Sequence, residues 1–205
     1  MLALFGLASC RPSGSATSTI VDDARNRVIA FRVWAPNQSR PAPLVLISHG
    51  AGGHYSDHMW LVNSLLGAGF IVVALNHPHD TRRDSSREGL VRVWDRPADV
   101  SLLLSHMLRD PEWSKRIDAR QVAVAGFSSG GYTAIALAGG IFHPAQMDQY
   151  CESEQRGPDC ELGRGVLVDR TNATLTFRDD RIKAAIAMAP AVGPGVTEES
   201  LKGID

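Results

Sequence analysis

Short runs of apolar residues alternate along this chain with segments in which apolar residues recur every three or four positions. An unbroken apolar run is typical of a strand buried on both faces, and the longer spacing is typical of a helix with one buried side. Regular alternation of the two is typical of β-α-β units around a mainly parallel sheet. The pattern predicts strands at 28–34, 44–47, 70–75, 122–125 and 183–188, and helices at 57–66, 97–108 and 133–138.

The helix predicted at 97–108 has the clearest sequence signature. It begins with a proline, whose fixed backbone angle and missing N–H suit the first turn of a helix. Its apolar side chains fall on one face, at Val100, Leu103, Leu104 and Met107. This face is therefore expected to pack on the sheet.

Composition and charge narrow the class of protein. The chain has 205 residues, enough for one domain with a substantial core, and its 44% hydrophobic and 21% charged residues are ordinary for a globular protein. The net charge is -1 and the basic residues form no stripe, so a nucleic-acid partner is not expected. No run approaches the roughly 18 apolar residues of a membrane-spanning helix, so we expect any membrane attachment to come from an end of the chain.

A candidate nucleophile follows the apolar run 122–125. The segment 126–130, Gly-Phe-Ser-Ser-Gly, fits the nucleophile-elbow pattern G-x-S-x-G, in which a sharp strand-to-helix turn exposes a serine hydroxyl. The turn crowds the backbone, so a side chain at Gly126 or Gly130 would clash. The alternative is a chance Gly/Ser loop. The position between an apolar strand and a helix of small residues favours the elbow, with Ser128 as the nucleophile.

A glycine-rich loop, 48–53, comes directly after the strand at 44–47. It resembles the HGGG-type loop that supplies an oxyanion donor in esterases and lipases. By this resemblance the two oxyanion-hole donors are the N–H groups of Ala51 and Ser129. A plain strand-to-helix turn would also favour glycine. Two such motifs in the right order make coincidence improbable.

Four segments together carry a family resemblance: 46–52, 76–78, 96–99 and 126–131. They look like the dienelactone hydrolase and platelet-activating-factor acetylhydrolase-like branch of the α/β-hydrolases. The resemblance implies an α/β fold with a mainly parallel sheet and helices on both faces, and hydrolysis of carboxylic esters without a cofactor. Dienelactone hydrolases proper use cysteine as the nucleophile, whereas this chain has Ser128, which shifts the expected substrate toward simple or lipid esters.

The partners of a Ser-Asp-His triad are not evident. In this fold the acid and then the histidine follow the serine, and the histidine comes after the last strand. The position where some relatives carry the acid is Ala189, and Asp205 is a terminal loop residue. We therefore expect the chain to be the N-terminal portion of the enzyme, lacking the last strands, with the acid and histidine beyond residue 205. The seven histidines all come earlier, at positions 49, 54, 58, 77, 79, 106 and 143.

Other functions use the same scaffold. A peptidase or a thioesterase would use the same nucleophile and oxyanion donors, so the bond cleaved follows from the resemblance alone. A protein without a triad would instead be a non-catalytic binding protein. The sequence favours a serine ester hydrolase that acts on a small-molecule or lipid ester.

The N-terminus indicates export. Residues 7–10, Leu-Ala-Ser-Cys, resemble the lipobox of bacterial lipoproteins, in which a signal peptide is removed and the cysteine is acylated. This resemblance predicts a signal peptide at 1–10 with lipidation at Cys10, a tether at 11–27, and the hydrolase domain at 28–205. The protein would then be an exported, periplasmic or cell-envelope lipoprotein. The segment has no Lys or Arg before Cys10, and a frayed terminus with a chance cysteine is the alternative.

Two further cysteines lie in a polar segment rich in turn residues. If Cys10 is lipidated, Cys151 and Cys160 leave an even count, as expected for one disulfide in an exported protein. Two free surface thiols are the alternative. A metal site is least favoured, because no C-x-x-C or paired-histidine spacing accompanies them. The segment itself, 150–160, is predicted to be neither helix nor core strand.

Overall fold

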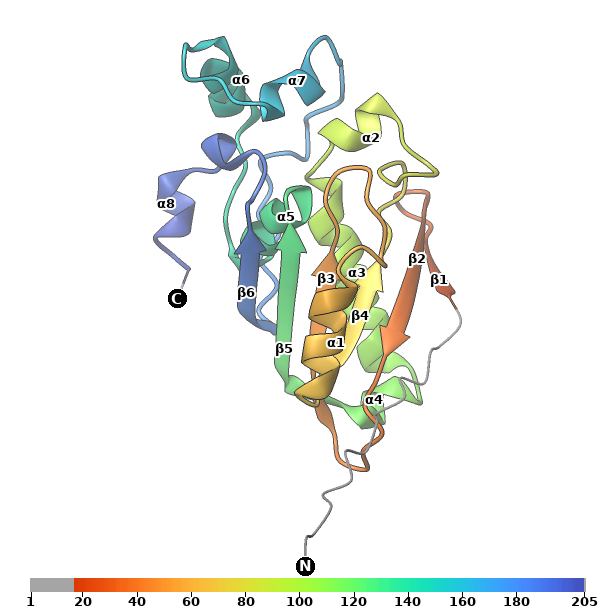
Figure 1. Ribbon diagram of the computed structural model, residues 1–205. Coiled ribbons are helices and arrows are strands. Elements are labelled where there is room, and N and C mark those ends of the chain that lie inside the picture. Colours follow the sequence, from red (N-terminus) through yellow and green to blue (C-terminus); the bar gives the residue numbers. More distant parts are fainter. Residues whose placement is uncertain (1–16, 205) are drawn as a thin grey trace, which may run out of the picture.

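The computed structural model describes residues 17–204, which are built around a six-stranded sheet (Figure 1). The strands run β1-β2-β4-β3-β5-β6 across the sheet. The four strands β4, β3, β5 and β6 are parallel to one another, and β2 is antiparallel to both β1 and β4. The predicted mainly parallel sheet is therefore confirmed. The strand bounds are β1 Ser18–Asp22, β2 Arg27–Trp34, β3 Ala42–Ser48, β4 Ile71–Leu75, β5 Ile117–Phe127 and β6 Ile182–Met188.

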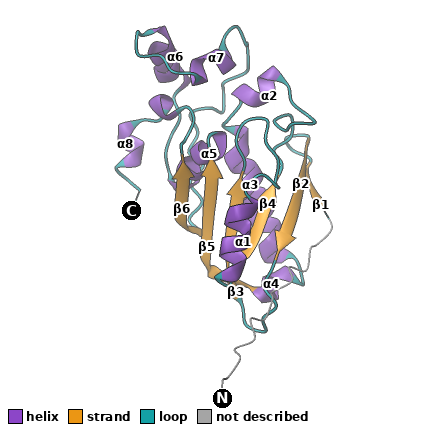
Figure 2. Ribbon diagram, in the orientation of Figure 1, coloured by secondary structure: helices purple, strands orange, loops and turns teal. Residues whose placement is uncertain are grey.

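Helices cover both faces of this sheet, as the sequence predicts (Figure 2). Helix α1 packs on one face, and α3 and α5 pack on the other. Short helices α2, α6 and α7 lie beyond the carboxyl ends of the parallel strands (Figure 1). The helix bounds are α1 Met59–Gly67, α2 Arg87–Val91, α3 Asp95–Arg109, α4 Trp113–Arg116, α5 Ser129–Ala138, α6 Pro144–Glu152, α7 Asp159–Gly163 and α8 Glu198–Leu201, with a 3-10 turn at Gly193–Gly195.

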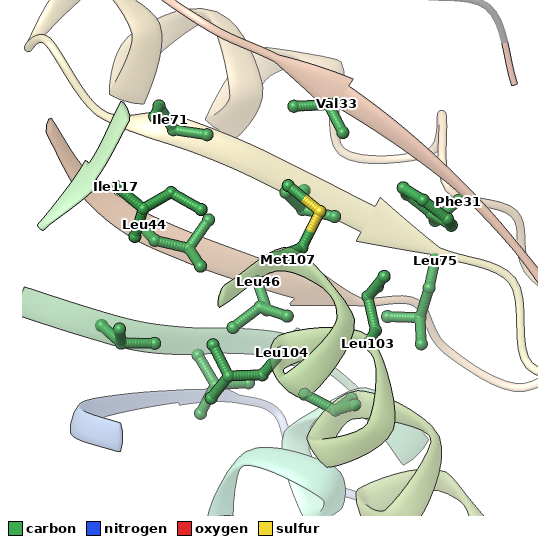
Figure 3. Packing of buried hydrophobic residues seen from close by; sticks show 14 of the residues in the cluster. Phe31, Val33, Leu44, Leu46, Ile71, Leu75, Leu103, Leu104, Met107 and Ile117 are labelled. Carbon is green, nitrogen blue, oxygen red and sulfur yellow. The ribbon is translucent and has the colours of Figure 1, made fainter. Parts of the chain in front are cut away.

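The main core lies between α3 and the sheet. The four side chains that the sequence placed on one face of this helix are all fully buried there. They meet Leu44 and Leu46 of β3 and Leu75 of β4 (Figure 3). On the opposite face, Val62 of α1 packs against Val45. The predicted amphipathic pattern therefore describes the packing correctly.

The first strand of the sheet lies in the segment predicted to be a tether. Residues 18–22 form β1, which pairs along its whole length with β2. Ile20 is buried against the main core, and its burial gives this short polar segment a reason to join the sheet. The expected signal peptide at 1–10, with Cys10, and the start of the expected tether lie outside the described residues, as does Asp205.

The cysteine segment is more ordered than its composition indicates. The prediction of an irregular segment at 150–160 is wrong at both ends, since α6 extends to Glu152 and α7 begins at Asp159, and it holds only for 153–158. A disulfide joins Cys151 to Cys160. Helices of nine and five residues are unstable alone and need packing to persist. Buried Met147 and the disulfide supply that packing here. Near the end of the described residues, the short helix α8 begins with Thr197 as its N-cap, whose side chain accepts the Ser200 N–H.

None of the helices within residues 17–204 combines the length and apolar character needed to cross a membrane.

Candidate active site

Ser128 occupies a strained turn between β5 and α5. Its backbone angles, φ 55° and ψ -118°, fall in a region that non-glycine residues rarely adopt. Two hydrogen bonds hold it there: its N–H donates to the Met188 carbonyl of β6 at 3.0 Å, and its carbonyl accepts from the Ala191 N–H at 3.0 Å. The turn places Ser128 at the carboxyl end of the parallel strands, where enzymes of this architecture bind ligands.

The two glycines of the motif allow this turn. A Cβ atom on Gly126 would lie 1.9 Å from the Gly130 carbonyl oxygen, and one on Gly130 would lie 2.0 Å from the Ser48 carbonyl oxygen. Both distances are far below any real contact. The glycine spacing in the sequence is thus a requirement of helix α5 packing tightly against β5 and the end of β3.

The glycine-rich loop after β3 lies beside Ser128. A Cβ on Gly50 would be 3.4 Å from the Ser128 Cβ, so the loop backbone passes close to the nucleophile position. Within residues 17–204, neither the Ala51 N–H nor the Ser129 N–H donates to another protein group. Ser129 also begins α5, whose positive end favours negative charge. Neither N–H group named from the sequence is therefore used by another group in the described part of the chain.

A buried ion pair between Arg96 and Asp80 holds the glycine-rich loop 48–53 in place. Arg96 of α3 donates to the carbonyl oxygens of His49 and Gly50, at 2.7 and 3.2 Å, and its Nε donates to Asp80 Oδ2 at 2.8 Å. Asp80 in turn accepts the Gly52 N–H at 2.7 Å. Arg96 and Asp80 are each only 1% exposed. The backbone on both sides of Ala51 is thus fixed by charged groups that are themselves paired.

Next to this pair lies a second serine with histidine and aspartate partners. Ser48 Oγ is 2.9 Å from His77 Nε2, and His77 Nδ1 is 2.9 Å from Asp99 Oδ2. Burial and the charge of Arg96 lower the pKa of His77 to about 3, so its ring is neutral. Because a carboxylate only accepts, Nδ1 carries the proton and donates to Asp99, and Nε2 accepts from the Ser48 hydroxyl.

Asp99 stays charged in this sealed position. Burial alone would raise its pKa, but hydrogen bonds from His77 and Arg27 lower it to about 2. Arg27 binds both carboxylate oxygens, at 2.7 and 2.8 Å, and Arg25 lies 3.0 Å from Asp99. Ser48, His77 and Asp99 are all 0% exposed. The hydrogen-bonded series Ser48–His77–Asp99 has the residue types of a catalytic triad, but a substrate cannot reach it.

The other histidines are not hydrogen-bonded to Ser128 either. His49 is buried, with Nδ1 2.6 Å from the Gly50 carbonyl, and burial holds its pKa well below the ordinary value. The His58 ring packs against Phe127, with ring centroids 5.8 Å apart. Among residues 17–204, which include all seven histidines, none hydrogen-bonds to the Ser128 hydroxyl. Within the described residues, no hydrogen bond therefore positions a histidine as a base for Ser128.

A cavity of about 440 Å³ opens beside the elbow, and we call it the α6–α7 pocket. Its wall includes Ser129 and Ala191, which adjoin Ser128, together with side chains of α6 and α7. No sequence motif predicts this pocket, because its apolar lining residues come from short helices and loops without a clear period. In residues 17–204 no group of histidine, cysteine and acidic side chains is arranged to hold a metal ion.

A doubly covered parallel sheet with a strained serine turn at its carboxyl edge defines the α/β-hydrolase type of fold. The family model described as "Alpha/beta hydrolase family" matches residues 44–202. The chain belongs to the alpha/beta hydrolase family.

Two solved structures of other hydrolases are similar to this chain. One is a dienelactone hydrolase from Anabaena variabilis, with 18% identity and a TM-score of 0.51, over 62% of this chain and 57% of that one. Another is a ferulic acid esterase from Streptomyces cinnamoneus, with 23% identity and a TM-score of 0.48, over 58% of this chain and 53% of that one. The matched part is thus little more than half the length of either relative.

Proposed function

We propose that the protein is a serine hydrolase that cleaves carboxylic esters. The Ser128 Oγ attacks the ester carbonyl carbon, the carbon–oxygen bond to the alcohol breaks, and water then releases the acid from the acyl-enzyme. The observation that carries this proposal is the strained elbow at Ser128, beside a glycine-rich loop whose backbone passes close to it. Within residues 17–204 the N–H groups of Ala51 and Ser129 have no protein acceptor. Such strain is retained where function needs it.

The N–H groups of Ala51 and Ser129 stabilise the oxyanion in this proposal. Preorganised donors of this kind act on charge that develops in the transition state, and removing one typically costs about 10²–10³-fold in rate. The hydrogen bonds from Arg96 and to Asp80 support the assignment of Ala51 as an oxyanion donor, because they fix the loop and a donor must be rigidly positioned to be effective.

The proton acceptor is a histidine beyond residue 205, with an acid to orient it. The positions of the seven histidines in this chain support that assignment, because His49 and His77 are buried with their ring nitrogens occupied and none bonds to Ser128. Without a base the serine hydroxyl stays protonated near neutral pH and is a poor nucleophile.

Hydrolysis of p-nitrophenyl acetate tests the proposal. A version extended through the next strands should turn over about 10⁴- to 10⁶-fold faster than the 205-residue chain, as expected when a triad is completed. Ser128→Ala in the extended version should remove that gain, whereas Ser114→Ala, at an exposed serine of α4, should not. Extended protein that is folded but no more active than its Ser128→Ala variant would contradict the proposal and favour a binding protein.

Activity already present in the short chain would need a different base. In that case His58, which packs beside Phe127, is the first candidate. His58→Ala would then abolish the activity of the short chain, and the assignment of the base beyond residue 205 would be wrong. Ester, thioester and amide substrates of matched acyl group compared in the extended version identify the bond cleaved.

We further propose that the protein is an exported lipoprotein held at a membrane by Cys10. The lipobox-like residues 7–10 and the disulfide support this location, because disulfides persist in oxidising compartments. Labelled fatty acid should enter the protein in a bacterial host, and Cys10→Ala should prevent it. Labelling that survives this change would exclude the lipid anchor.

A further inference from the structure

The α6–α7 pocket has the size and lining of a site for a small apolar group. Its volume of about 440 Å³ falls within the ~300–1,000 Å³ that is usual for small-molecule sites. Trp94, Phe142, Met147 and Leu162 contribute apolar side chains to its wall. Leu162 is 41% exposed, so part of its apolar side chain is accessible to a molecule in the pocket.

The floor of the pocket is preformed. The Trp94 and Phe142 rings are stacked with centroids 6.0 Å apart, and Tyr132 of α5 meets the Phe142 ring edge to face at 5.8 Å. Trp94 and Tyr132 are almost completely buried. An apolar ligand would therefore meet a rigid aromatic surface and would not have to order it on binding.

The charged groups on the wall do not favour a charged ligand. Arg170 pairs with Asp148 at 2.6 Å, and Arg164 pairs with Glu161 at 2.6 Å. Asp159 accepts the Val192 N–H at 2.8 Å. Glu152 is the remaining charged residue of the lining, and its negative charge disfavours a free carboxylate. The chemistry of the wall thus fits an uncharged apolar group.

The disulfide forms part of the pocket wall. Cys151 lies on α6 and Cys160 on α7, and both line the cavity. The bond holds together two helices that are too short to be stable alone. It therefore fixes the spacing of α6 and α7 where both line the cavity.

The pocket also ends at the candidate nucleophile. Ser129 directly follows Ser128, and Ala191 donates its N–H to the Ser128 carbonyl. We propose that the α6–α7 pocket binds an apolar chain of an ester whose carbonyl carbon lies at Ser128, and that the Cys151–Cys160 disulfide sets the length of chain that fits. This inference rests on the proposed function. The chain belongs either to the acyl group or to the alcohol, and the experiment separates the two.

Binding is measured without turnover, by calorimetry on the Ser128→Ala protein. Methyl octanoate should bind at least about tenfold more tightly than methyl butanoate, because burial of each additional methylene group is favourable. Heptyl acetate is an isomer of methyl octanoate with its chain on the alcohol side. Whichever isomer binds more tightly identifies the side of the ester that enters the pocket.

Two leucine variants locate the binding. Leu162→Asp should reduce the preference for methyl octanoate by about tenfold, because it adds a charge to the apolar wall. Leu167→Asp is the matched control: this leucine is 95% exposed, follows α7 in the sequence and does not line the pocket. The control should bind as the parent does. A Cys151→Ser/Cys160→Ser double variant should lose the chain-length preference while remaining folded, as judged by its far-ultraviolet circular dichroism.

Equal affinity for the long and short esters would overturn the inference, as would equal effects of Leu162→Asp and Leu167→Asp. A double cysteine variant that keeps the full preference would remove the role of the disulfide. These outcomes are independent of the proposed catalysis, because the Ser128→Ala protein used to measure binding lacks the candidate nucleophile. Conversely, failure of ester hydrolysis in the extended enzyme would leave the binding result unchanged.

Discussion

Two serines of this protein, Ser48 and Ser128, lie close together and differ in almost every physical respect. Ser48 ends β3 with a neutral histidine and a charged aspartate beyond it, and the whole set is sealed from solvent. Ser128 is partly exposed at a strained turn, and within residues 17–204 its hydroxyl has no hydrogen-bond partner. The buried serine has the partners of a catalytic residue, and the exposed one has the position.

The difference shows that a triad is defined by access and backbone geometry as well as by residue type. The buried hydrogen bonds around Ser48 stabilise the neighbouring backbone. His77 holds Ser48 in place, and the adjacent Arg96 holds the loop that contains Ala51. The same side-chain chemistry thus supports a site when it is buried and can perform a reaction only when a substrate can approach. The following changes test this division.

Removing the charge of Asp99, at the end of the buried Ser48–His77–Asp99 series, should cause the largest loss of stability. Asp99→Asn would leave Arg27 buried without its carboxylate, and breaking a buried pair in this way costs about 3–5 kcal/mol. Urea unfolding measures the loss. Asp180→Asn, at an exposed pair with Arg178, is the control and should cost about 1 kcal/mol or less. A similar small cost at Asp99 would show that the buried chain contributes little to stability.

Adding one carbon where the two serine regions touch should cost about 3 kcal/mol or more. The Gly130→Ala Cβ would meet the Ser48 carbonyl oxygen at 2.0 Å, and both partners are backbone that cannot easily move. Gly67→Ala, at the end of α1, has no atom within 4 Å of its Cβ and should stay within about 1 kcal/mol of the parent. If thermal melts show the two variants to be equally stable, the tight approach of α5 to β3 is not required.

Acid should loosen the buried chain before it affects Ser128. The folded-state pKa of His77 is lowered to about 3 from an ordinary value near 6.5. The stabilising contribution is therefore complete above pH 6.5 and is lost as the pH falls toward 3, because the unfolded chain takes up the proton first. At pH 5 the loss is about 2 kcal/mol. Burial lowers the pKa of His49 too, which adds in the same direction.

Unfolding free energies at pH 7.5 and pH 5 measure this loss. The imidazole signals of His77, followed by NMR, should show a neutral ring at both values. The prediction is wrong if His77 titrates near pH 6.5 in the folded protein, or if the unfolding free energy does not change between the two pH values.

The smallest effects should come from the same substitution at the two serines. Ser48→Ala removes the hydroxyl that His77 accepts from and should cost about 1–3 kcal/mol. Ser128→Ala should change stability by about 0.5 kcal/mol or less, because no protein hydrogen bond within residues 17–204 is lost. Differential scanning calorimetry compares them. The division between support and reaction fails if Ser128→Ala is the more destabilising change.

The sequence predicted the strands and long helices well because their patterns are local. Runs such as 44–47 and the apolar face of α3 depend on neighbouring residues and on one sheet, and the structure confirms both. Strand β1 was missed because its short segment is mostly polar and joins the sheet only through pairing with β2. Helices α6 and α7 were missed because tertiary packing and a disulfide stabilise them.

The candidate site was predicted to a similar degree. The glycine spacing around Ser128 and the glycine-rich loop at Ala51 are local patterns, which neighbouring residues are enough to identify. The support beneath them joins residues far apart, such as Arg27 to Asp99 and Arg96 to Asp80, and no local pattern identifies such partners. Arg96 and Asp99 entered only through a family resemblance. A sign was nevertheless present: Arg96 and Asp99 lie one helical turn before Val100 and Leu103 of the apolar face, and polar residues on a buried face need buried partners.

The backbone angles of Ser128 also restrict which mutations evolution can use at this position. Its left-handed turn tolerates an unbranched side chain, whereas a β-branched residue there would be severely strained. Threonine is therefore a poor replacement, although it carries the same hydroxyl. Cysteine, which is unbranched at Cβ, fits the same backbone angles. Lineages that descend from this turn can exchange oxygen for sulfur by one codon change, but the equally short mutational step to threonine should produce a misfolded elbow.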